Sequence, residues 1–118
     1  MASLGMDGAH DLTAENVDEV VTSTSPGNYA LGRTNDQGRF VPKYVGRSDS
    51  DVAARLRVHA AEGKYREFKF SYADSARKAF DKECRNYHDF ESQLDNEAHP
   101  QRPSGKDWPC PVAECFEL

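Results

Sequence analysis

Residues 67–72, EFKFSY, alternate strictly between polar and aromatic side chains, and this short segment limits the folds open to the chain. A period of two is the pattern of a strand with one buried face. Residues 28–31 and 40–45 are also strand-like, and the turn-forming residues 34–38 between them predict an antiparallel hairpin. Pro42 predicts that the second strand of this hairpin lies at an edge or carries a bulge.

Helical patterns alternate with these strands. Thr13 is a suitable N-cap for a short helix that ends before the STSPG segment, residues 23–27. A second helix is predicted from a Ser48 or Ser50 cap to Gly63, and a third from Asp74 or Ser75 to about residue 90. The order β-β-α-β-α predicts an α+β fold, with a small three-stranded antiparallel sheet packed against helices.

The chain has 118 residues, enough for one domain with a modest core. We expect a flexible leader and short helix at 1–24, the main domain at 25–103 and an irregular tail at 104–118, where prolines limit regular structure. Glycines and a lack of apolar periodicity make residues 1–12 the flexible part. The sequence contains neither a membrane-length apolar run nor a signal-peptide pattern, so we expect a cytoplasmic protein without a membrane partner.

Charge is distributed unevenly along the chain. The formal net charge is -5, which gives no overall attraction to nucleic acid. Residues 33–70 nevertheless hold nine Lys and Arg against five Asp and Glu, a local charge of +4. The middle of the chain is therefore basic, and Gly46 with Arg47 lies at the predicted exit from the second strand. We expect Gly46 to permit a sharp turn there.

Glu83 falls inside the apolar stripe of the third helix, between Phe80 and Tyr87. Burying an unpaired carboxylate costs on the order of several kcal/mol. Two interpretations remain open. Glu83 either bends back to water or pairs with Lys82 or Arg85, or it binds a hard divalent cation such as Mg²⁺.

Five other side chains have both a structural and a functional interpretation. Arg55 and His59 are one helical turn apart, and they are either an exposed arginine beside a core histidine or a phosphate clamp beside a proton carrier. Tyr29 and Tyr44 on neighbouring strands either pack across the sheet or point their hydroxyls at one place. Asn96, in a proline-flanked loop, is either a turn residue or part of the same site.

The ordered set of these residues resembles the GIY-YIG nuclease family. The similarity covers about residues 26–103 and rests on five segments taken together: GNYAL at 27–31, YVGRS at 44–48, ARLRVH at 54–59, KECRNYHDF at 82–90 and LDN at 94–96. The family name would place isoleucine where this chain has Asn28 and Val45, but the tyrosines and glycines of both motifs are present.

The resemblance implies a divalent-metal-dependent endonuclease that hydrolyses DNA phosphodiester bonds with Mg²⁺ or Mn²⁺. It implies six catalytic positions: Tyr29, Tyr44, Arg55, His59, Glu83 and Asn96. Glu83 would hold the metal, Arg55 with the neighbouring Arg47 would bind phosphate, and Tyr29 or Tyr44 would accept a proton from water, with His59 as a relay. Asn96 would orient the phosphate or a tyrosine.

Two other function classes stay open. One is a non-catalytic nucleic-acid-binding module with the same fold, and the other is a protein-interaction domain that uses the acidic ends of the chain. Sequence or structure preference, DNA against RNA, biological role and oligomeric state do not follow from the residues.

Cysteine usage adds little at this level. The chain has a small and odd number of cysteines, Cys84, Cys110 and Cys115, so we do not expect a disulfide framework. Cys110 and Cys115, with His99 upstream, faintly resemble part of a zinc ribbon. Their spacing is wider than the usual two intervening residues, so we interpret them as ordinary cysteines.

Overall fold

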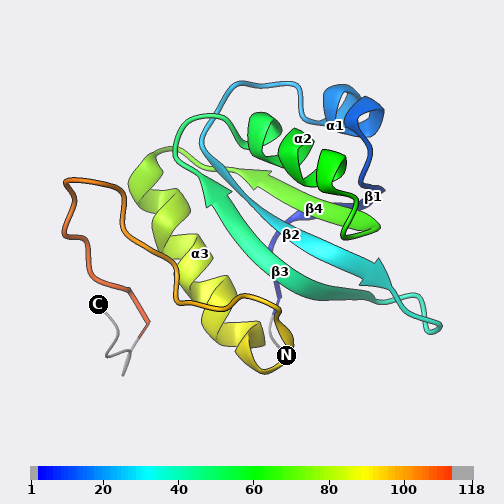
Figure 1. Ribbon diagram of the computed structural model, residues 1–118. Helices are drawn as coiled ribbons and strands as arrows, with labels where there is room; N and C mark the ends of the chain where they lie inside the picture. Colours follow the sequence, from blue (N-terminus) through cyan, green and yellow to red (C-terminus); the bar gives the residue numbers. More distant parts are fainter. Residues whose placement is uncertain (1–2, 113–118) are drawn as a thin grey trace.

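In the computed structural model, which describes residues 3–112, four antiparallel strands form one sheet in the order β1-β4-β2-β3 (Figure 1). The strands are β1 (Asp7–Asp11), β2 (Gly27–Thr34), β3 (Phe40–Ser48) and β4 (Glu67–Tyr72). The α+β class predicted from the sequence is confirmed, and so is the hairpin, which consists of β2 and β3.

The predicted number of strands was wrong. Residues 7–11 belong to the segment predicted as a flexible leader, yet they pair with β4 as the strand β1. The sequence DGAHD has no apolar alternation, and its side chains other than His10 are exposed. Its pairing depends on backbone hydrogen bonds to the edge of β4, which no side-chain pattern reveals.

Three α-helices and one short 3-10 helix complete the fold: α1 (Ala14–Val20), α2 (Val52–Glu62), α3 (Ala76–Phe90) and η1 (Glu91–Gln93). The Thr13 and Ser75 caps are confirmed, because each side chain accepts a backbone N–H of its helix. The cap of α2 is Asp51, so the expectation of Ser48 or Ser50 was wrong. The Ser48 hydroxyl instead accepts from the backbone of residues 50 and 51 in the preceding turn.

The two faces of the sheet are covered by different helices. Figure 1 shows α1 and α2 together on one face and α3 on the other. Tyr29 and Leu31 of the central strand β2 pack with Leu56 of α2, whereas Ala30 packs on the opposite face with Tyr87 of α3. Because β2 is covered on both sides, its first six residues are all buried.

Strand β3 forms one edge of the sheet, and Pro42 lies in it as predicted. The pairing register between β2 and β3 shifts beside Pro42, where Leu31 pairs with Tyr44 and Gly32 pairs with Pro42. Both predicted features, the edge position and the bulge, are therefore confirmed.

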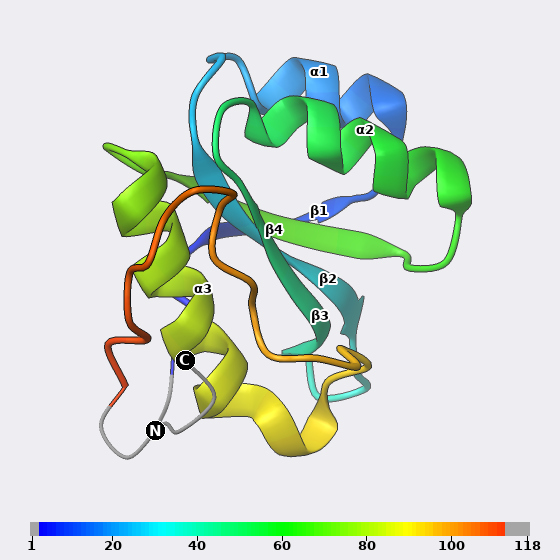
Figure 2. The same cartoon turned by 60° about the vertical axis from the view of Figure 1, so that its left-hand side comes forward.

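The segment after η1 folds back onto the domain. Residues 94–112 contain no helix or strand, and both views show this segment running beside α3 (Figures 1 and 2). Among residues 3–112, no helix has the length and apolar character needed to cross a membrane.

Candidate functional site at the edge of strand β3

Tyr29 reaches the edge of the sheet from its central strand because Gly46 has no side chain. The two residues are paired across β2 and β3. A methyl group built on Gly46 would overlap the Cζ and hydroxyl of Tyr29. The expected role of Gly46 in a sharp turn was wrong, since it lies within β3. Its role is to let the Tyr29 ring cross over β3.

The Tyr29 hydroxyl begins a chain of hydrogen bonds. It lies 2.8 Å from Nε2 of His59, and Nδ1 of His59 lies 3.1 Å from the Glu62 carboxylate. Since a carboxylate only accepts, Nδ1 of His59 donates to Glu62, and Nε2 accepts from the Tyr29 hydroxyl. The arrangement fixes the tautomer of His59 and gives the Tyr29 proton a defined acceptor.

Burial is the main influence on the pKa values of Tyr29 and His59 in this series of hydrogen bonds. It raises the pKa of Tyr29 well above the usual range, although the nearby Arg55 acts in the opposite direction. Burial also lowers the pKa of His59 below its ordinary value, against the opposing effect of Glu62. At neutral pH, Tyr29 therefore keeps its proton, and His59 is a neutral base ready to accept it.

Tyr44 lies against the same pair of rings. Its ring stacks on that of Tyr29 with 6.5 Å between centroids and tilts against His59 at 5.5 Å. Burial raises the pKa of Tyr44, and the charge of Glu83 adds to this effect. Both predicted tyrosines therefore meet at one place, but only Tyr29 is hydrogen-bonded to the histidine.

Glu83 reaches this edge from α3, on the opposite face of the sheet. Its side chain is 10% exposed and accepts a hydrogen bond of 2.6 Å from Nη1 of Arg47. Burial raises the pKa of Glu83, and Arg47 opposes that rise. Neither Lys82 nor Arg85 is its partner, because Lys82 donates instead to the Gly5 carbonyl and the Ser71 hydroxyl.

Arg47 is more constrained than its predicted role as a phosphate ligand requires. Its Nε donates to Asp49 at 2.8 Å, its Nη1 donates to Glu83, and its guanidinium lies over the Phe80 ring. Burial lowers the pKa of Arg47, but Asp49 and Glu83 outweigh it, so the net shift is upward. Arg47 therefore neutralises and positions Glu83.

One pocket of about 390 Å³ collects most of the predicted site. Its lining residues come from β2, β3, α2, α3 and the segment after α3: Tyr29, Tyr44, Gly46, Arg47, Asp49, Arg55, Glu83, Gln101 and Arg102. Of the predicted catalytic residues, His59 lies behind Tyr29 and Asn96 lines the adjoining pocket, which shares Tyr44 and Glu83. Arg55 is exposed, and its charge lies close enough to act on Tyr29.

Asn96 contacts neither a tyrosine hydroxyl nor Glu83 through any hydrogen bond of the described residues. Its amide oxygen accepts from the Val45 N–H at 3.0 Å, and its amide nitrogen donates to the Val45 carbonyl at 2.9 Å. The Asp95 N–H also bonds to the Lys43 carbonyl. The Asn96 amide thus forms the hydrogen bonds that a further strand would form at the free edge of β3, and it positions the backbone between Tyr44 and Gly46.

Sequence reasoning missed four residues of the site. Glu62 lies three residues after His59, and this helical spacing could have revealed the pair. Asp49 lies only two residues after Arg47, from which it accepts a hydrogen bond. Gln101 and Arg102 have no comparable local signal, because their positions depend on how the segment after α3 folds back.

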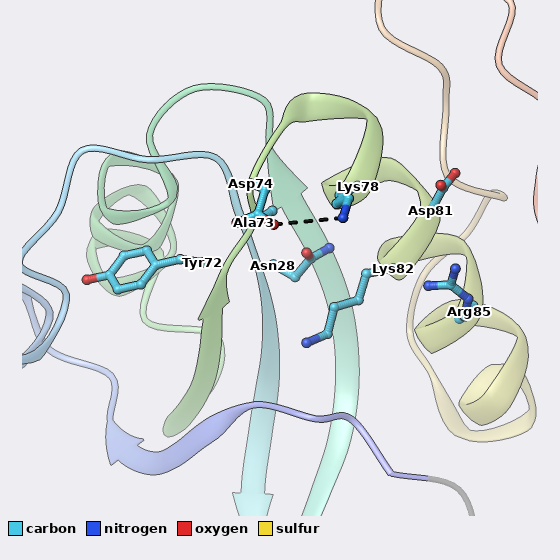
Figure 3. A pocket seen from close by; sticks show the side chains of 8 residues that line it. All are labelled: Asn28, Tyr72, Ala73, Asp74, Lys78, Asp81, Lys82 and Arg85. Carbon is cyan, nitrogen blue, oxygen red and sulfur yellow. Dashed lines mark ion pairs between the residues drawn. The ribbon is translucent and has the colours of Figure 1, made fainter.

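A second pocket, of about 370 Å³, lies between β4 and α3 and contains none of the predicted site residues (Figure 3). Two of its three cations are already engaged, since Lys78 pairs with Asp74 and Lys82 donates to Gly5 and Ser71. We therefore assign the site to the pocket at the edge of β3.

The chemistry of the β3 pocket fits a hard divalent cation. Glu83 supplies a carboxylate, of which only one oxygen takes part in the hydrogen bond to Arg47. Mg²⁺ in nucleic-acid enzymes is often held by one or two carboxylates together with water and substrate phosphate. One buried carboxylate that opens onto a polar pocket is compatible with that coordination.

Comparisons with known proteins assign no function to this site, so its interpretation depends on the geometry described above. No family model, curated protein or solved structure matches the chain.

The pairing of Asn96 with Val45 predicts a measurable contribution to stability. Asn96→Ala removes two hydrogen bonds at a partly buried edge, so we expect the free energy of unfolding to fall by about 1–2 kcal/mol. Urea denaturation followed by circular dichroism measures it. Glu97→Ala, at the exposed neighbouring position, should change stability by less than about 0.5 kcal/mol. Equal stability of the two variants would contradict the role assigned to Asn96.

Proposed function

We propose that this protein is a divalent-metal-dependent endonuclease that hydrolyses DNA phosphodiester bonds in the β3 pocket. The observation that carries the proposal is the hydrogen-bonded chain from Tyr29 through His59 to Glu62, which begins at the wall of a pocket that also contains Arg55 and Glu83. A hydroxyl backed by a neutral base, an exposed guanidinium and a buried carboxylate are the groups that phosphodiester hydrolysis needs.

The proton path runs through Tyr29. Water attacks phosphorus and gives a proton to the Tyr29 oxygen while the Tyr29 hydroxyl passes its own proton to Nε2 of His59. The imidazolium that forms is stabilised by Glu62, which already accepts from Nδ1. Because both transfers occur together, Tyr29 is not required to ionise beforehand, and its raised pKa does not prevent the reaction. The bond from phosphorus to the leaving oxygen breaks, and that oxygen takes a proton from solvent.

Arg55 and Glu83 act on the phosphate. The exposed guanidinium of Arg55 can bind a non-bridging oxygen, and this contact strengthens as charge develops on phosphorus. Glu83 would hold Mg²⁺ or Mn²⁺, which stabilises negative charge on the phosphate and the leaving oxygen when it is bound. Arg47 opposes the rise in the Glu83 pKa that burial causes, and its hydrogen bond holds the carboxylate in place.

Cations beside the site support a nucleic-acid substrate. Four of them, Arg33, Lys43, Lys64 and Arg66, line a small pocket with Tyr65. Lys64 also lines the pocket that contains Tyr44 and Glu83, so the two pockets adjoin at this residue. A chain of phosphates could follow this path, which would explain DNA binding by a protein of net charge -5.

The non-catalytic binding module remains the second candidate, and one observation favours it. The Glu83 carboxylate already has a short hydrogen bond to Arg47, so a metal ion must compete with a guanidinium for it. If Glu83 stays bound to Arg47 rather than to a metal ion, the same surface binds nucleic acid without cutting it.

Cleavage of supercoiled plasmid with and without Mg²⁺ or Mn²⁺ separates the two candidates. We expect nicking only with metal, a fall of about 10²–10⁴ in rate for Tyr29→Phe, and loss of activity for Glu83→Gln. Glutamine keeps the size and a hydrogen-bond acceptor for Arg47, so this variant is less disruptive than Glu83→Ala.

Two variants serve as controls for this assay. Glu97→Gln removes an exposed carboxylate of the adjoining pocket and should cleave at the wild-type rate. Tyr44→Phe should retain more activity than Tyr29→Phe, because Tyr44 has no hydrogen bond to His59 among the described residues. Wild-type activity of Tyr29→Phe would overturn the proton path, and wild-type protein that cuts neither plasmid nor branched or single-stranded DNA or RNA would overturn the nuclease.

The His59 relay also predicts the direction of the pH dependence. Burial lowers the pKa of His59, with Glu62 opposing and Arg55 reinforcing the shift, so the neutral form persists below the ordinary value of 6.5. As the pH falls through this lowered pKa, kcat/KM should drop about tenfold per unit, because protonated His59 cannot accept the Tyr29 proton. Rates measured from pH 4.5 to about 8 test this. His59→Gln should be slow and lack this acid limb, and a variant with the same limb would exclude His59 as its origin.

The basic path predicts the salt dependence of binding. In Glu83→Gln, which binds without cutting, the slope of log K against log salt should fall by about 2 when Lys64→Ala and Arg66→Ala are added, about 1 for each lost phosphate contact. Fluorescence anisotropy of a labelled duplex measures it. Lys78→Ala, in the other pocket, should leave the slope unchanged. Equal effects at both places would contradict the path.

A further inference from the structure

Three side chains with metal-binding atoms converge outside the catalytic pocket. The ligand atoms of Cys84, His99 and Cys110 all lie within 4.8 Å of one another. The chain has only three cysteines and four histidines. Two of those cysteines and one of those histidines form this group. His88, one helical turn after Cys84, lies beside it and contacts His99. The residues come from α3 and from two points of the segment that follows it.

The hydrogen bonding of His99 is that of a metal ligand. Nδ1 of His99 lies 2.9 Å from the Pro100 carbonyl, to which it must donate. This bond leaves the lone pair on Nε2, the arrangement that metal-bound histidines commonly show. Nε2 of His99 in turn lies 3.2 Å from Nε2 of His88.

The group is compact enough for a tetrahedral zinc ion. Zn–N bonds of about 2.0–2.1 Å place two nitrogen ligands about 3.3 Å apart, close to the separation of His88 and His99. Zn–S bonds of about 2.3 Å place two sulfur ligands about 3.8 Å apart, within the spread of the cluster. Thiolate and imidazole ligands favour Zn²⁺ over Mg²⁺, which prefers oxygen. Cys84 is fully buried, as in a structural rather than an open catalytic site.

We propose that Cys84, His99, Cys110 and His88 bind one structural Zn²⁺ ion. The ion joins α3 to the segment that follows it, which contains no helix or strand of its own among residues 94–112. Within the loop between the ligands His99 and Cys110, Gln101 and Arg102 line the catalytic pocket. Zinc would therefore fix one wall of that pocket. From the sequence, Cys110 was interpreted as an ordinary cysteine. Its proximity to Cys84 was not expected, because the two are separated by 25 residues in the sequence.

The proposal is tested with the full-length chain, without reference to nuclease activity. Protein purified with zinc should hold about one Zn²⁺ per chain by elemental analysis. Co²⁺ in its place should give thiolate charge-transfer absorption and the visible bands of a tetrahedral ion. Zinc added to metal-free protein should raise the melting temperature, because it binds the folded state.

Variants assign the individual ligands. Cys110→Ser, His99→Asn and His88→Asn should each weaken Zn²⁺ binding by more than about 100-fold and remove the thermal shift, since loss of a ligand exceeds the effect of losing an outer partner. Cys84→Ser is the fourth variant, and the partly exposed Cys110 and His99 keep the test decisive if it fails to fold. His10→Asn, on strand β1, is the matched control and should bind as the wild type does. Cys115→Ser, at a position outside the described residues, tests the alternative fourth ligand.

Three results would contradict the proposal. Wild-type protein without stoichiometric zinc, or a Co²⁺ spectrum without thiolate bands, would exclude the site. A mass spectrum that shows Cys84 joined to Cys110 by a disulfide in protein kept under reducing conditions would replace it with a covalent link. Loss of zinc in Cys115→Ser but not in His88→Asn would overturn His88 as the fourth ligand.

Discussion

The passage of the Tyr29 ring over Gly46 is the contact on which the rest of the site depends. Tyr29 lies on the central strand, so its hydroxyl would ordinarily end in the core between the sheet and α2. A glycine at the paired position of β3 opens a channel one residue wide, and the phenol crosses it to the pocket. His59 of α2 then meets the hydroxyl from the core side. One missing side chain thus connects a buried base with a solvent-accessible pocket.

The edge position of β3 explains how residues from both faces of the sheet act together. Along β3 successive side chains point to opposite faces, so Tyr44 joins the α2 face while Arg47 joins α3. In the middle of a sheet these groups would be separated by the neighbouring strand. At the edge, Arg47 and Glu83 turn around the strand and line the same pocket as Tyr29. Asn96 forms two hydrogen bonds to the β3 backbone at this edge, so these backbone groups are paired although no strand lies beside them.

The elements that could be predicted from the sequence are those with a local signal. The alternation of residues 67–72 and the proline in β3 identified strands and an edge, and the Thr13 and Ser75 caps follow directly from residue type. The strand β1 could not be found, because its pairing is a property of the β4 backbone. The same limit applies to the site. The apolar stripe of α3 marked Glu83 as unusual, but its partner Arg47 is 36 residues earlier, and no helical spacing could identify it.

The segment after α3 contributes residues to both proposed sites, and it is held in place at two points. A segment without helix or strand loses much conformational entropy when it is held in one shape, and its own hydrogen bonds offset only part of that cost. Asn96 attaches its beginning to β3, and the cluster at Cys84 attaches its later part to α3. The residues between these attachments include Gln101 and Arg102, which line the pocket beside Glu83. Since Cys84 is adjacent to Glu83 on α3, an ion bound there would fix this wall directly against the helix that supplies the carboxylate.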